Sequence, residues 1–487
     1  MEKNNLGKVV GLVLAVVLVL LALYWLPQVS VGDWSMRKVD LLADVRSDSA
    51  MRQLLAGDST LAGSMNGDTA ITDGYQPPYI ADSPVLQGSR LTRDKKGRLV
   101  TLEDSIINAK AEVTKSRNGV TSIIDMSDGA PGGMAGFYRA LAQSQSRPVR
   151  IAVLGDSYIE GDIMTAMLRQ LLQQRFGGQG VGYVPMTSIT AGFRLTCKHT
   201  FGGWTQHKAV DRAGYVDTYN NITGNYFNAG QGAWVNLTGI GTPYSLAGTC
   251  TSSSFYFMGG AGSGYVTAVV NGADSTYFPL NTNSVVGYAT VHGNIKSVKW
   301  IVTNPGNMIF LGTSMDGNNG VIVDNFSLRS SSGQHLRKVP ASIMAAFNQA
   351  RHYDLVIIMY GLNIAGHNNS AYTAYCRTVA GAINNIKSNM PGTSILVVGC
   401  SDREERGANG WRTMPGVLGL IQAQKRVAID THVAFWDLYS AMGGEGSIVE
   451  MVQRGEANKD YTHINHRGGN RIARYLYDAL MLGYENR

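Results

Sequence analysis

Charged residues and cysteine are both scarce in this sequence. Aspartate, glutamate, lysine and arginine together make up 16% of it, and the four cysteines are Cys197, Cys250, Cys376 and Cys400. The cysteines have no CxxC or metal-like spacing, which argues against a zinc cluster, and leaves buried thiols or disulfides as their two possible states. The lysines and arginines are scattered rather than gathered into a basic stripe interleaved with aromatic residues, so no nucleic-acid partner is expected.

Apolar residues and glycine are plentiful instead. Apolar residues make up 44% of the chain, and there are 58 glycines, a composition that supplies packed cores and many tight turns. A chain of 487 residues exceeds what one hydrophobic core usually organises. The sequence therefore predicts a folded protein with more than one domain.

The N-terminus carries an uncharged apolar segment. Residues 9–26 are 18 residues without a charge, about the minimum that crosses a bilayer as a helix, and Lys3 and Lys8 precede them. Positive flanks stay on the cytoplasmic side, so residues 1–27 are predicted to be a transmembrane helix that leaves the remaining chain outside the membrane. The alternative is a cleaved signal peptide, although Pro27 to Ser30 match a cleavage site poorly.

Residues 28–134 are interpreted as a polar lead-in or stalk, because turn pairs interrupt them and no apolar period is sustained. The pattern then changes. An apolar run at 150–154 ends in a turn and is followed by apolar residues at helical spacing, which predicts strand, turn and helix. Strand-like and helix-like segments alternate again in the last third of the chain. We expect 135–200 and 326–487 to form one α/β/α unit with a parallel sheet.

Between these halves, residues 201–325 have few charges and many glycines and aromatics. Short alternating runs such as 254–257 and 297–302 are separated by turn clusters, which is typical of an all-β sandwich or jelly roll. We therefore predict an inserted β domain. The glycines at 260–264 lack GxGxxG spacing and are interpreted as a turn.

A Gly-Asp-Ser triplet ends the first predicted strand, and Ser157 is its serine. The triplet alone is weak evidence, since a second copy ends at Ser59 and follows no strand. At the carboxyl end of a parallel strand, however, a hydroxyl faces the crevice where open α/β sheets bind ligands. We therefore predict that Ser157 is a nucleophile.

A serine nucleophile needs a base, and the segment Asp460-Tyr461-Thr462-His463 offers one. Spacing of three residues on a turn lets the carboxylate hold one imidazole nitrogen while the other accepts the serine proton. His466 is the rival base, but it has no acid three residues earlier. A metal site made by both histidines is rejected because neighbouring ligands are lacking.

An oxyanion donor is also required, and Gly361-Leu362-Asn363 follows the predicted strand 355–360. The Asn363 amide would emerge at the same sheet edge as Ser157 and could stabilise negative charge. Its alternative role is that of a loop-capping asparagine.

The order strand-GDS, GxN and C-terminal DxxH resembles that of the SGNH (GDSL-like) hydrolase superfamily. More narrowly, the segments GDSYIEGDIMT, GGQGVGYVP, FWDLYSAMGG and KDYTHINHRGG resemble bacterial peptidoglycan O-acetylesterases with an embedded carbohydrate-binding-like β domain. The resemblance covers roughly residues 135–487. It implies a flavodoxin-like three-layer fold, Ser157, Asp460 and His463 as catalytic residues, and no metal or organic cofactor.

The resemblance also implies an oxyanion hole made by the Ser157 amide, the Asn363 side chain and a glycine amide from a second motif. In this chain Ser330 stands at that glycine, where a side chain disfavours left-handed dihedrals, so Gly333 is the fallback donor. Five aromatic residues of the insertion are either sugar-stacking or core residues: Trp204, Trp234, Tyr244, Tyr265 and Trp300.

The expected function is removal of O-acetyl groups from a cell-envelope glycan, with peptidoglycan the first candidate, on the periplasmic side of the membrane. An O-acetyltransferase using the same serine and a non-catalytic glycan-binding module are the alternatives. The sequence does not distinguish water from a sugar hydroxyl as the acyl acceptor.

Overall fold

The computed structural model describes residues 30–31, 34–35, 91–93, 99–114, 116–259, 264–281, 283–366, 371–407 and 410–487. The predicted membrane helix and the second Gly-Asp-Ser triplet lie outside these residues. Among the described residues we find no helix that is long and apolar enough to span a membrane. The chain divides into two compact units, 1–69 and 70–487. In the first, the short strands β1 (Ser30–Val31) and β2 (Trp34–Ser35) pair antiparallel.

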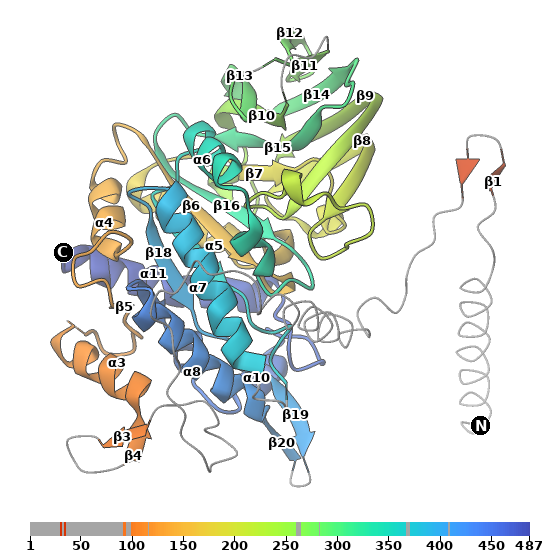
Figure 1. Ribbon diagram of the computed structural model, residues 1–487. Helices are drawn as coiled ribbons and strands as arrows, with labels where there is room; N and C mark the ends of the chain where they lie inside the picture. Colours follow the sequence, from red (N-terminus) through yellow and green to blue (C-terminus); the bar gives the residue numbers. More distant parts are fainter. Residues whose placement is uncertain are drawn as a thin grey trace, which may run out of the picture. The chain divides into compact units, whose positions relative to one another are not determined.

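A six-stranded sheet forms the centre of the second unit (Figure 1). Its order is β16-β6-β17-β18-β21-β5, and neighbouring strands are parallel except at the β21–β5 edge. The strands are β5 (Ile124–Asp125), β6 (Pro148–Gly155), β16 (Gly320–Ser327), β17 (Leu355–Met359), β18 (Ser394–Val398) and β21 (Ala434–Trp436). All residues of β17, β18 and β21 are buried, as expected for strands covered on both faces.

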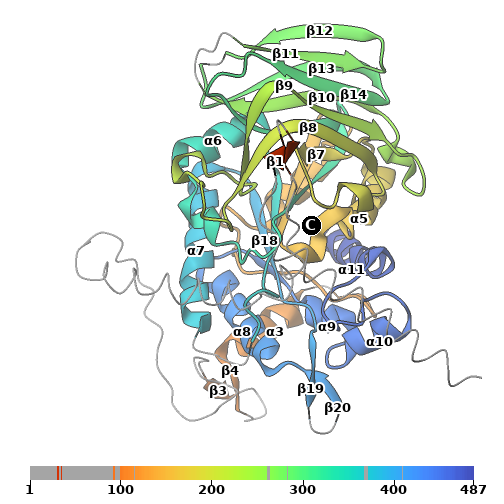
Figure 2. The same cartoon turned by 90° about the vertical axis from the view of Figure 1, so that its right-hand side faces the viewer.

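Helices cover both faces of this sheet. Figure 2 shows α7 and α8 on one side of β18, and α5 and α11 on the other. The α-helices are α3 (Leu102–Val113), α4 (Met134–Ala142), α5 (Thr165–Phe176), α6 (Ala341–Ala350), α7 (Ala371–Asn389), α8 (Pro415–Asp430), α9 (Leu438–Met442), α10 (Ser447–Gln453) and α11 (His466–Glu485). The 3₁₀ helices are η1 (Ser157–Asp162), η2 (Ala191–Phe193), η3 (Asp217–Tyr219), η4 (Ser245–Ala247) and η5 (Gln334–Lys338). The predicted three-layer arrangement is confirmed.

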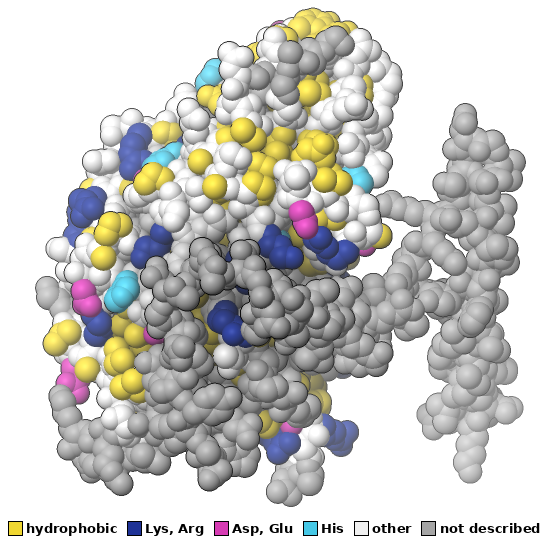
Figure 3. All heavy atoms as spheres, viewed as in Figure 1, with side chains coloured by type: hydrophobic (Ala, Val, Ile, Leu, Met, Phe, Trp, Pro, Cys, Tyr) yellow, Lys and Arg dark blue, Asp and Glu magenta, His cyan; other side chains and the backbone are white. Residues whose placement is uncertain are grey.

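A nine-stranded antiparallel sheet accompanies the parallel one. Its order is β12-β11-β14-β9-β15-β10-β13, with β7 paired to β15 and β8 to β9. The strands are β7 (Gly182–Pro185), β8 (Cys197–Lys208), β9 (Asn225–Gly239), β10 (Cys250–Met258), β11 (Tyr265–Val270), β12 (Asp274–Pro279), β13 (Val286–Ile295), β14 (Ser297–Thr303) and β15 (Ile309–Asp316). On the face shown in Figure 3, charged side chains are few over this part and more frequent below it.

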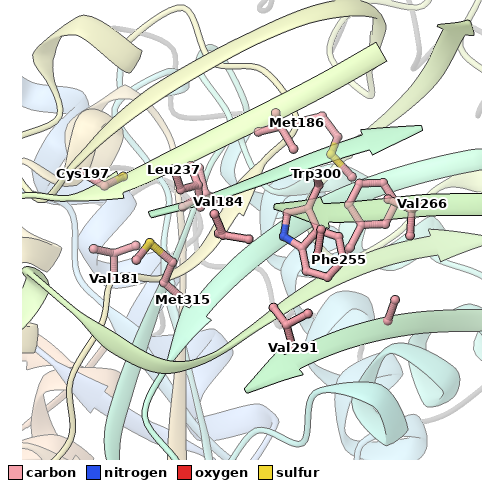
Figure 4. Packing of buried hydrophobic residues seen from close by; sticks show 14 of the residues in the cluster. Val181, Val184, Met186, Cys197, Leu237, Phe255, Val266, Val291, Trp300 and Met315 are labelled. Atoms are coloured by element: carbon pink, nitrogen blue, oxygen red, sulfur yellow. The ribbon is translucent and has the colours of Figure 1, made fainter. Parts of the chain in front are cut away.

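The antiparallel sheet folds back on itself around its own core. Phe255 of β10 and Trp300 of β14 are not on neighbouring strands, yet their ring centroids lie 5.5 Å apart. Figure 4 shows the two rings together. The Trp300 indole N–H donates to Ser253 Oγ at 3.1 Å, and the ring is fully buried. The predicted antiparallel β domain is therefore present, with a hydrophobic core separate from the parallel sheet.

The boundaries of this domain differ from the predicted 201–325. The antiparallel sheet already begins with β7 at Gly182 and ends with β15 at Asp316, whereas β16 pairs in parallel with β6. Seven of the eight residues of β16 are buried, as are all residues of β15, so burial does not distinguish the two strands and the pairing partner decides to which sheet β16 belongs. The predicted lead-in also contributes to the α/β unit, because α3 packs against α8 and β5 pairs with β21.

Two further short hairpins lie at the periphery: β3 (Leu91–Arg93) with β4 (Leu99–Thr101), and β19 (Glu404–Gly407) with β20 (Gly410–Thr413). All four cysteines are buried thiols and none forms a disulfide, which is one of the two states that the sequence left open.

A buried arginine joins the two sheets. Arg351, which follows α6, donates to Asp324 of β16 at 2.5 and 2.6 Å and to Asp316 of β15 at 2.6 and 3.0 Å. Tyr353 donates its hydroxyl to Asp324 at 2.6 Å, and Tyr256 of β10 accepts from Arg351 at 2.9 Å. Because the arginine and both carboxylates are buried, the cluster is stable only with all its charges paired.

We expect Arg351→Met to lower the free energy of unfolding by about 3–5 kcal/mol, because it leaves two buried carboxylates without their cation. Urea titration followed by far-UV circular dichroism measures the change. The matched control is Arg212→Met, whose bidentate pair with Asp217 is about half exposed on both sides and is expected to contribute under about 1 kcal/mol. Equal losses in the two variants would contradict the role assigned to the buried cluster.

Candidate active site

Ser157 lies directly after β6, where the chain turns sharply into η1. The last residue of β6 is Gly155, and no side chain fits at this position. A Cβ atom there would lie 2.8 Å from Ile159 Cδ1 and 3.0 Å from the Met359 carbonyl oxygen. Asp156 caps the turn by accepting the backbone N–H of the residue after Ser157 at 2.9 Å. The half-buried Ser157 is thereby placed at the carboxyl edge of the parallel sheet, as predicted.

The predicted DxxH segment brings its histidine to this serine. Ser157 Oγ lies 3.0 Å from His463 Nε2, and His463 Nδ1 lies 2.8 Å from Asp460 Oδ2. The other carboxylate oxygen accepts the backbone N–H groups of Thr462 and His463, each at 3.0 Å. The turn therefore fixes the carboxylate against its own loop, and an imidazole protonated on Nδ1 presents Nε2 to the serine hydroxyl.

Helix α11 follows this loop and packs closely on the serine side of the site. Asn465 caps the helix by accepting the N–H groups of Arg467 and Gly468 at 3.0 and 3.3 Å. Gly469 permits the approach, because a Cβ there would lie 2.1 Å from the carbonyl oxygen of Ile163, just beyond η1. The glycines after His466 thus hold the histidine loop against the serine turn.

The imidazole and its carboxylate shift each other's pKa values. The hydrogen bond that His463 donates to Asp460 raises the pKa of His463 above its ordinary value, and burial opposes this. Burial raises the pKa of Asp460, but hydrogen bonds from the His463 side chain and backbone outweigh it and lower this pKa to about 2. Asp460 is therefore ionised wherever His463 is neutral enough to accept a proton.

The rival histidine points elsewhere. His466 Nε2 lies 3.0 Å from the carbonyl oxygen of Phe193 in η2, and no contact with Ser157 is found. No group of His, Cys, Asp and Glu side chains within the described residues has the arrangement of a metal site. The geometry therefore separates His463 from His466 as the sequence predicted.

Asn363 reaches the site but its amide hydrogens already have acceptors. Nδ2 donates to Asp156 Oδ2 at 3.1 Å and to the Ser331 carbonyl oxygen at 2.9 Å. A side-chain amide has two N–H hydrogens, so in this arrangement neither is left over for an oxyanion. The structure brings Asn363 to the predicted edge and shows it bridging the serine turn and the loop after β16.

Asp156 has a larger part in this arrangement than the sequence indicated. It is 1% exposed and accepts from the backbone N–H of Tyr158 and from Asn363. Burial raises its pKa to about 6, while hydrogen bonds from Tyr158 and Gly361 act in the opposite direction. The carboxylate holds the GDS and GxN loops together, and its burial could not be read from the triplet alone.

The structure bears on the choice between Ser330 and Gly333. Ser330 has φ +65°, so it adopts the left-handed conformation despite its side chain, and we find no hydrogen-bond acceptor for its N–H within the described part of the chain. The Gly333 N–H instead donates to Ser331 Oγ at 3.0 Å. Of the two amides, Ser330 is the one left available for a ligand.

Two side-chain pairs near the site were not anticipated. Arg329, beside Ser330, donates to both carboxylate oxygens of Glu160 in η1, at 3.0 and 2.5 Å. On the histidine side, Trp411 of β20 stacks on Tyr461, with ring centroids 3.8 Å apart. Both pairs join segments far apart in the chain, and neither has a local sequence signal.

The aromatic residues of the antiparallel domain are mostly interior. Trp300 is 0% and Tyr244 is 2% exposed, so sugar stacking by these two is excluded. Trp204 packs against the domain core, and the half-buried Trp234 ring lies 4.6 Å from Lys299 Nζ. Among the five candidates, Tyr265 is the one with an exposed ring.

Compared by sequence, the chain matches no family model and no curated protein. Compared by structure, it is similar to a peptidoglycan O-acetylesterase, with 23% identity, a TM-score of 0.61, and alignment over 75% of this chain and 99% of the other. We base the fold assignment on this structure. The likeness shows that this chain shares the fold of that esterase.

More distant similarities are found to a family two carbohydrate esterase from Cellvibrio japonicus and a lipase/acylhydrolase from Enterococcus faecalis. The first has 9% identity, a TM-score of 0.24 and coverage of 60% of this chain and 99% of the other. The second has 16% identity, a TM-score of 0.25 and coverage of 34% and 77%.

Proposed function

We propose that this chain is an SGNH-type serine esterase that removes O-acetyl groups from a cell-envelope glycan, with peptidoglycan as the substrate. The observation that carries the proposal is the continuous hydrogen-bond chain from Ser157 through His463 to Asp460. It stands at the carboxyl edge of the sheet, in the fold shared with a peptidoglycan O-acetylesterase. No metal or organic cofactor is part of the proposed reaction.

The first half of the reaction forms an acetyl-enzyme. His463 Nε2 takes the Ser157 proton as Oγ attacks the acetyl carbonyl, and the Asp460 carboxylate stabilises the resulting imidazolium. The imidazolium then gives its proton to the sugar oxygen as the ester bond breaks, which leaves the acetyl group on Ser157. In the second half, His463 deprotonates a water that attacks this ester, and acetate and free Ser157 are formed.

Negative charge on the carbonyl oxygen needs hydrogen-bond donors during both steps. We assign the backbone amides of Ser157 and Ser330 to this role, since neither has an acceptor among the described residues. The Asn363 side-chain amide becomes a third donor when the substrate oxygen replaces Asp156 or the Ser331 carbonyl oxygen as its acceptor. Arg329 is held by Glu160 and fixes the backbone immediately before Ser330.

The N-terminal segment is the basis for the proposed location of the enzyme. The uncharged segment 9–26 is proposed to anchor the chain in the membrane with the catalytic unit on the periplasmic side, where acetylated glycans are accessible. The antiparallel domain is proposed to contact the glycan away from the nucleophile. Tyr265 is its exposed candidate for that contact.

The experiment that tests the proposed function is incubation of the full chain with O-acetylated peptidoglycan and with other acetylated polysaccharides. Free acetate and acetyl groups transferred to added oligosaccharide are both quantified. Release of acetate from peptidoglycan is expected. Transfer of acetyl groups to the oligosaccharide without free acetate would indicate an O-acetyltransferase instead. If the chain bound the glycan and formed neither product, it would be a non-catalytic glycan-binding module.

Hydrolysis of the aryl acetate is expected to slow as the pH falls, and the midpoint of this acid limb should lie above 6.5, the ordinary pKa of histidine. Only neutral His463 accepts the serine proton, and Asp460 raises the pKa of this group, so kcat/KM should rise with pH through that raised value. Asp460→Asn should move the limb to lower pH and reduce the rate above it by roughly 10³–10⁴-fold.

The pKa of Asp156, at about 6, lies close to the same pH range. The Asp460→Asn variant shows whether His463 or Asp156 controls the acid limb of the rate profile. If Asp460→Asn left the limb unmoved, the assignment to His463 would be wrong. The measurement is a stopped or continuous assay of kcat/KM across pH in both proteins.

A further inference from the structure

The β19–β20 hairpin is tied at its base to the loops that carry the candidate site. Arg403, just before β19, donates to the carbonyl oxygens of Leu362 and Ala365 at 3.1 and 3.3 Å, on the loop of Asn363. The Glu404 N–H donates to the Tyr461 carbonyl oxygen at 3.1 Å, in the loop of His463. In Figures 1 and 2 the hairpin stands out from the body of the second unit.

Trp411 is the aromatic side chain that this hairpin presents. One face of its ring stacks on Tyr461, with an interplanar angle of 28°, and the side chain is still 45% exposed. With one face on Tyr461, an exposed fraction of this size leaves part of the Trp411 ring open to solvent. The ring is therefore held in one orientation before any ligand arrives, which limits the entropy lost on binding.

The position of this ring relative to the nucleophile follows from the chain. Tyr461 precedes His463 by two residues, which span at most about 7 Å of backbone. His463 Nε2 in turn lies 3.0 Å from Ser157 Oγ. Tyr461 has φ +53°, an uncommon conformation for a side chain of this size, and backbone hydrogen bonds hold it: its N–H donates to the Asn458 carbonyl oxygen, and its own carbonyl oxygen accepts from the Glu404 N–H, each at 3.1 Å.

We propose that Trp411, supported by Tyr461, is a sugar-stacking platform that binds one pyranose ring of the glycan beside the acetylated residue. This inference rests on the proposed function. The axial C–H groups of a pyranose form a flat apolar face, and an exposed aromatic ring buries that face while leaving the sugar hydroxyls in water. When the acetyl group of a polymer is held at Ser157, the neighbouring sugars of that polymer lie within reach of Trp411. A small aryl ester has no neighbouring sugar that could contact Trp411.

The test compares Trp411→Ala, Trp411→Leu and Trp411→Phe in the full chain, on a small aryl acetate and on O-acetylated peptidoglycan. For Ala and Leu we expect kcat/KM on the polymer to fall about tenfold, mainly through KM, with aryl acetate hydrolysis within about twofold of the parent. The Phe variant should keep most of the polymer rate. Leu matches Phe in bulk and lacks the flat ring, so this pair isolates stacking.

Equal losses on both substrates would show that Trp411 only supports the Tyr461 loop, and would overturn the proposal. Unchanged polymer kinetics in Trp411→Leu would do the same.

A binding measurement separates this proposal from the proposed function. Full chain carrying Ser157→Ala is sedimented with insoluble peptidoglycan, with and without Trp411→Leu. We expect about tenfold weaker retention in the double variant. The result does not depend on turnover, so it holds even if the chain hydrolyses aryl acetate and not the polymer. Equal retention of both proteins, or no retention of the parent, would overturn the platform.

Discussion

Replacement of Ser157 by alanine is expected to reduce hydrolysis of a small aryl acetate by roughly 10⁴–10⁶-fold. The variant removes the oxygen that lies 3.0 Å from His463 Nε2, so no acyl-enzyme can form. The thermal unfolding midpoint should change little, because a half-buried hydroxyl at a turn contributes little packing.

Ser59→Ala is the matched control, since it alters the serine of the second Gly-Asp-Ser triplet. Its activity should equal that of the parent. A Ser157→Ala protein that kept most of its activity would show that the nucleophile had been misassigned, and activity lost only together with the folding transition would show that the serine is structural.

Replacement of His463 by alanine is expected to cost nearly as much as loss of Ser157, again roughly 10⁴–10⁶-fold, because the hydroxyl then has no base. The His466→Ala variant should retain activity within a few-fold, since its ring contacts the Phe193 carbonyl oxygen rather than the serine. Rates on aryl acetate at a pH well above the acid limb measure both.

The double variant Ser157→Ala with His463→Ala sharpens this comparison. Residues that act as one unit are not additive, so the second substitution should cause almost no further loss. A double variant much slower than either single one would mean that the two residues act independently, and equal losses for His463→Ala and His466→Ala would remove the basis for choosing between them.

The parts of the site that follow from short stretches of sequence were predicted correctly in position. The apolar run before Ser157 forms β6, and the three-residue spacing of Asp460 and His463 gives the expected contact within one turn. Both outcomes depend on interactions between residues close in the chain. The parallel sheet was predictable for a similar reason, because strands buried on both faces have continuous apolar runs.

The roles of Asn363 and Ser330 needed the fold. That the Asn363 amide donates to Asp156 and Ser331 depends on loops after three different strands meeting at one edge. That Ser330 tolerates φ +65° depends on its surroundings, which outweigh the local penalty on a side chain. Residue type alone predicted a difficulty at Ser330 that the tertiary structure overcomes.

By itself, the sequence determined the α/β class, the antiparallel insertion and the identity of a serine, a histidine and an acid at strand and loop ends. The tertiary structure decided which strands belong to which sheet, since β16 joins β6 across more than 160 residues of chain. It also decided that Trp300 is core and Trp411 is surface. The physical reason is that periodicity and turn spacing act within a few residues, whereas partner choice, burial and stacking depend on contacts that exist only once distant segments have packed together.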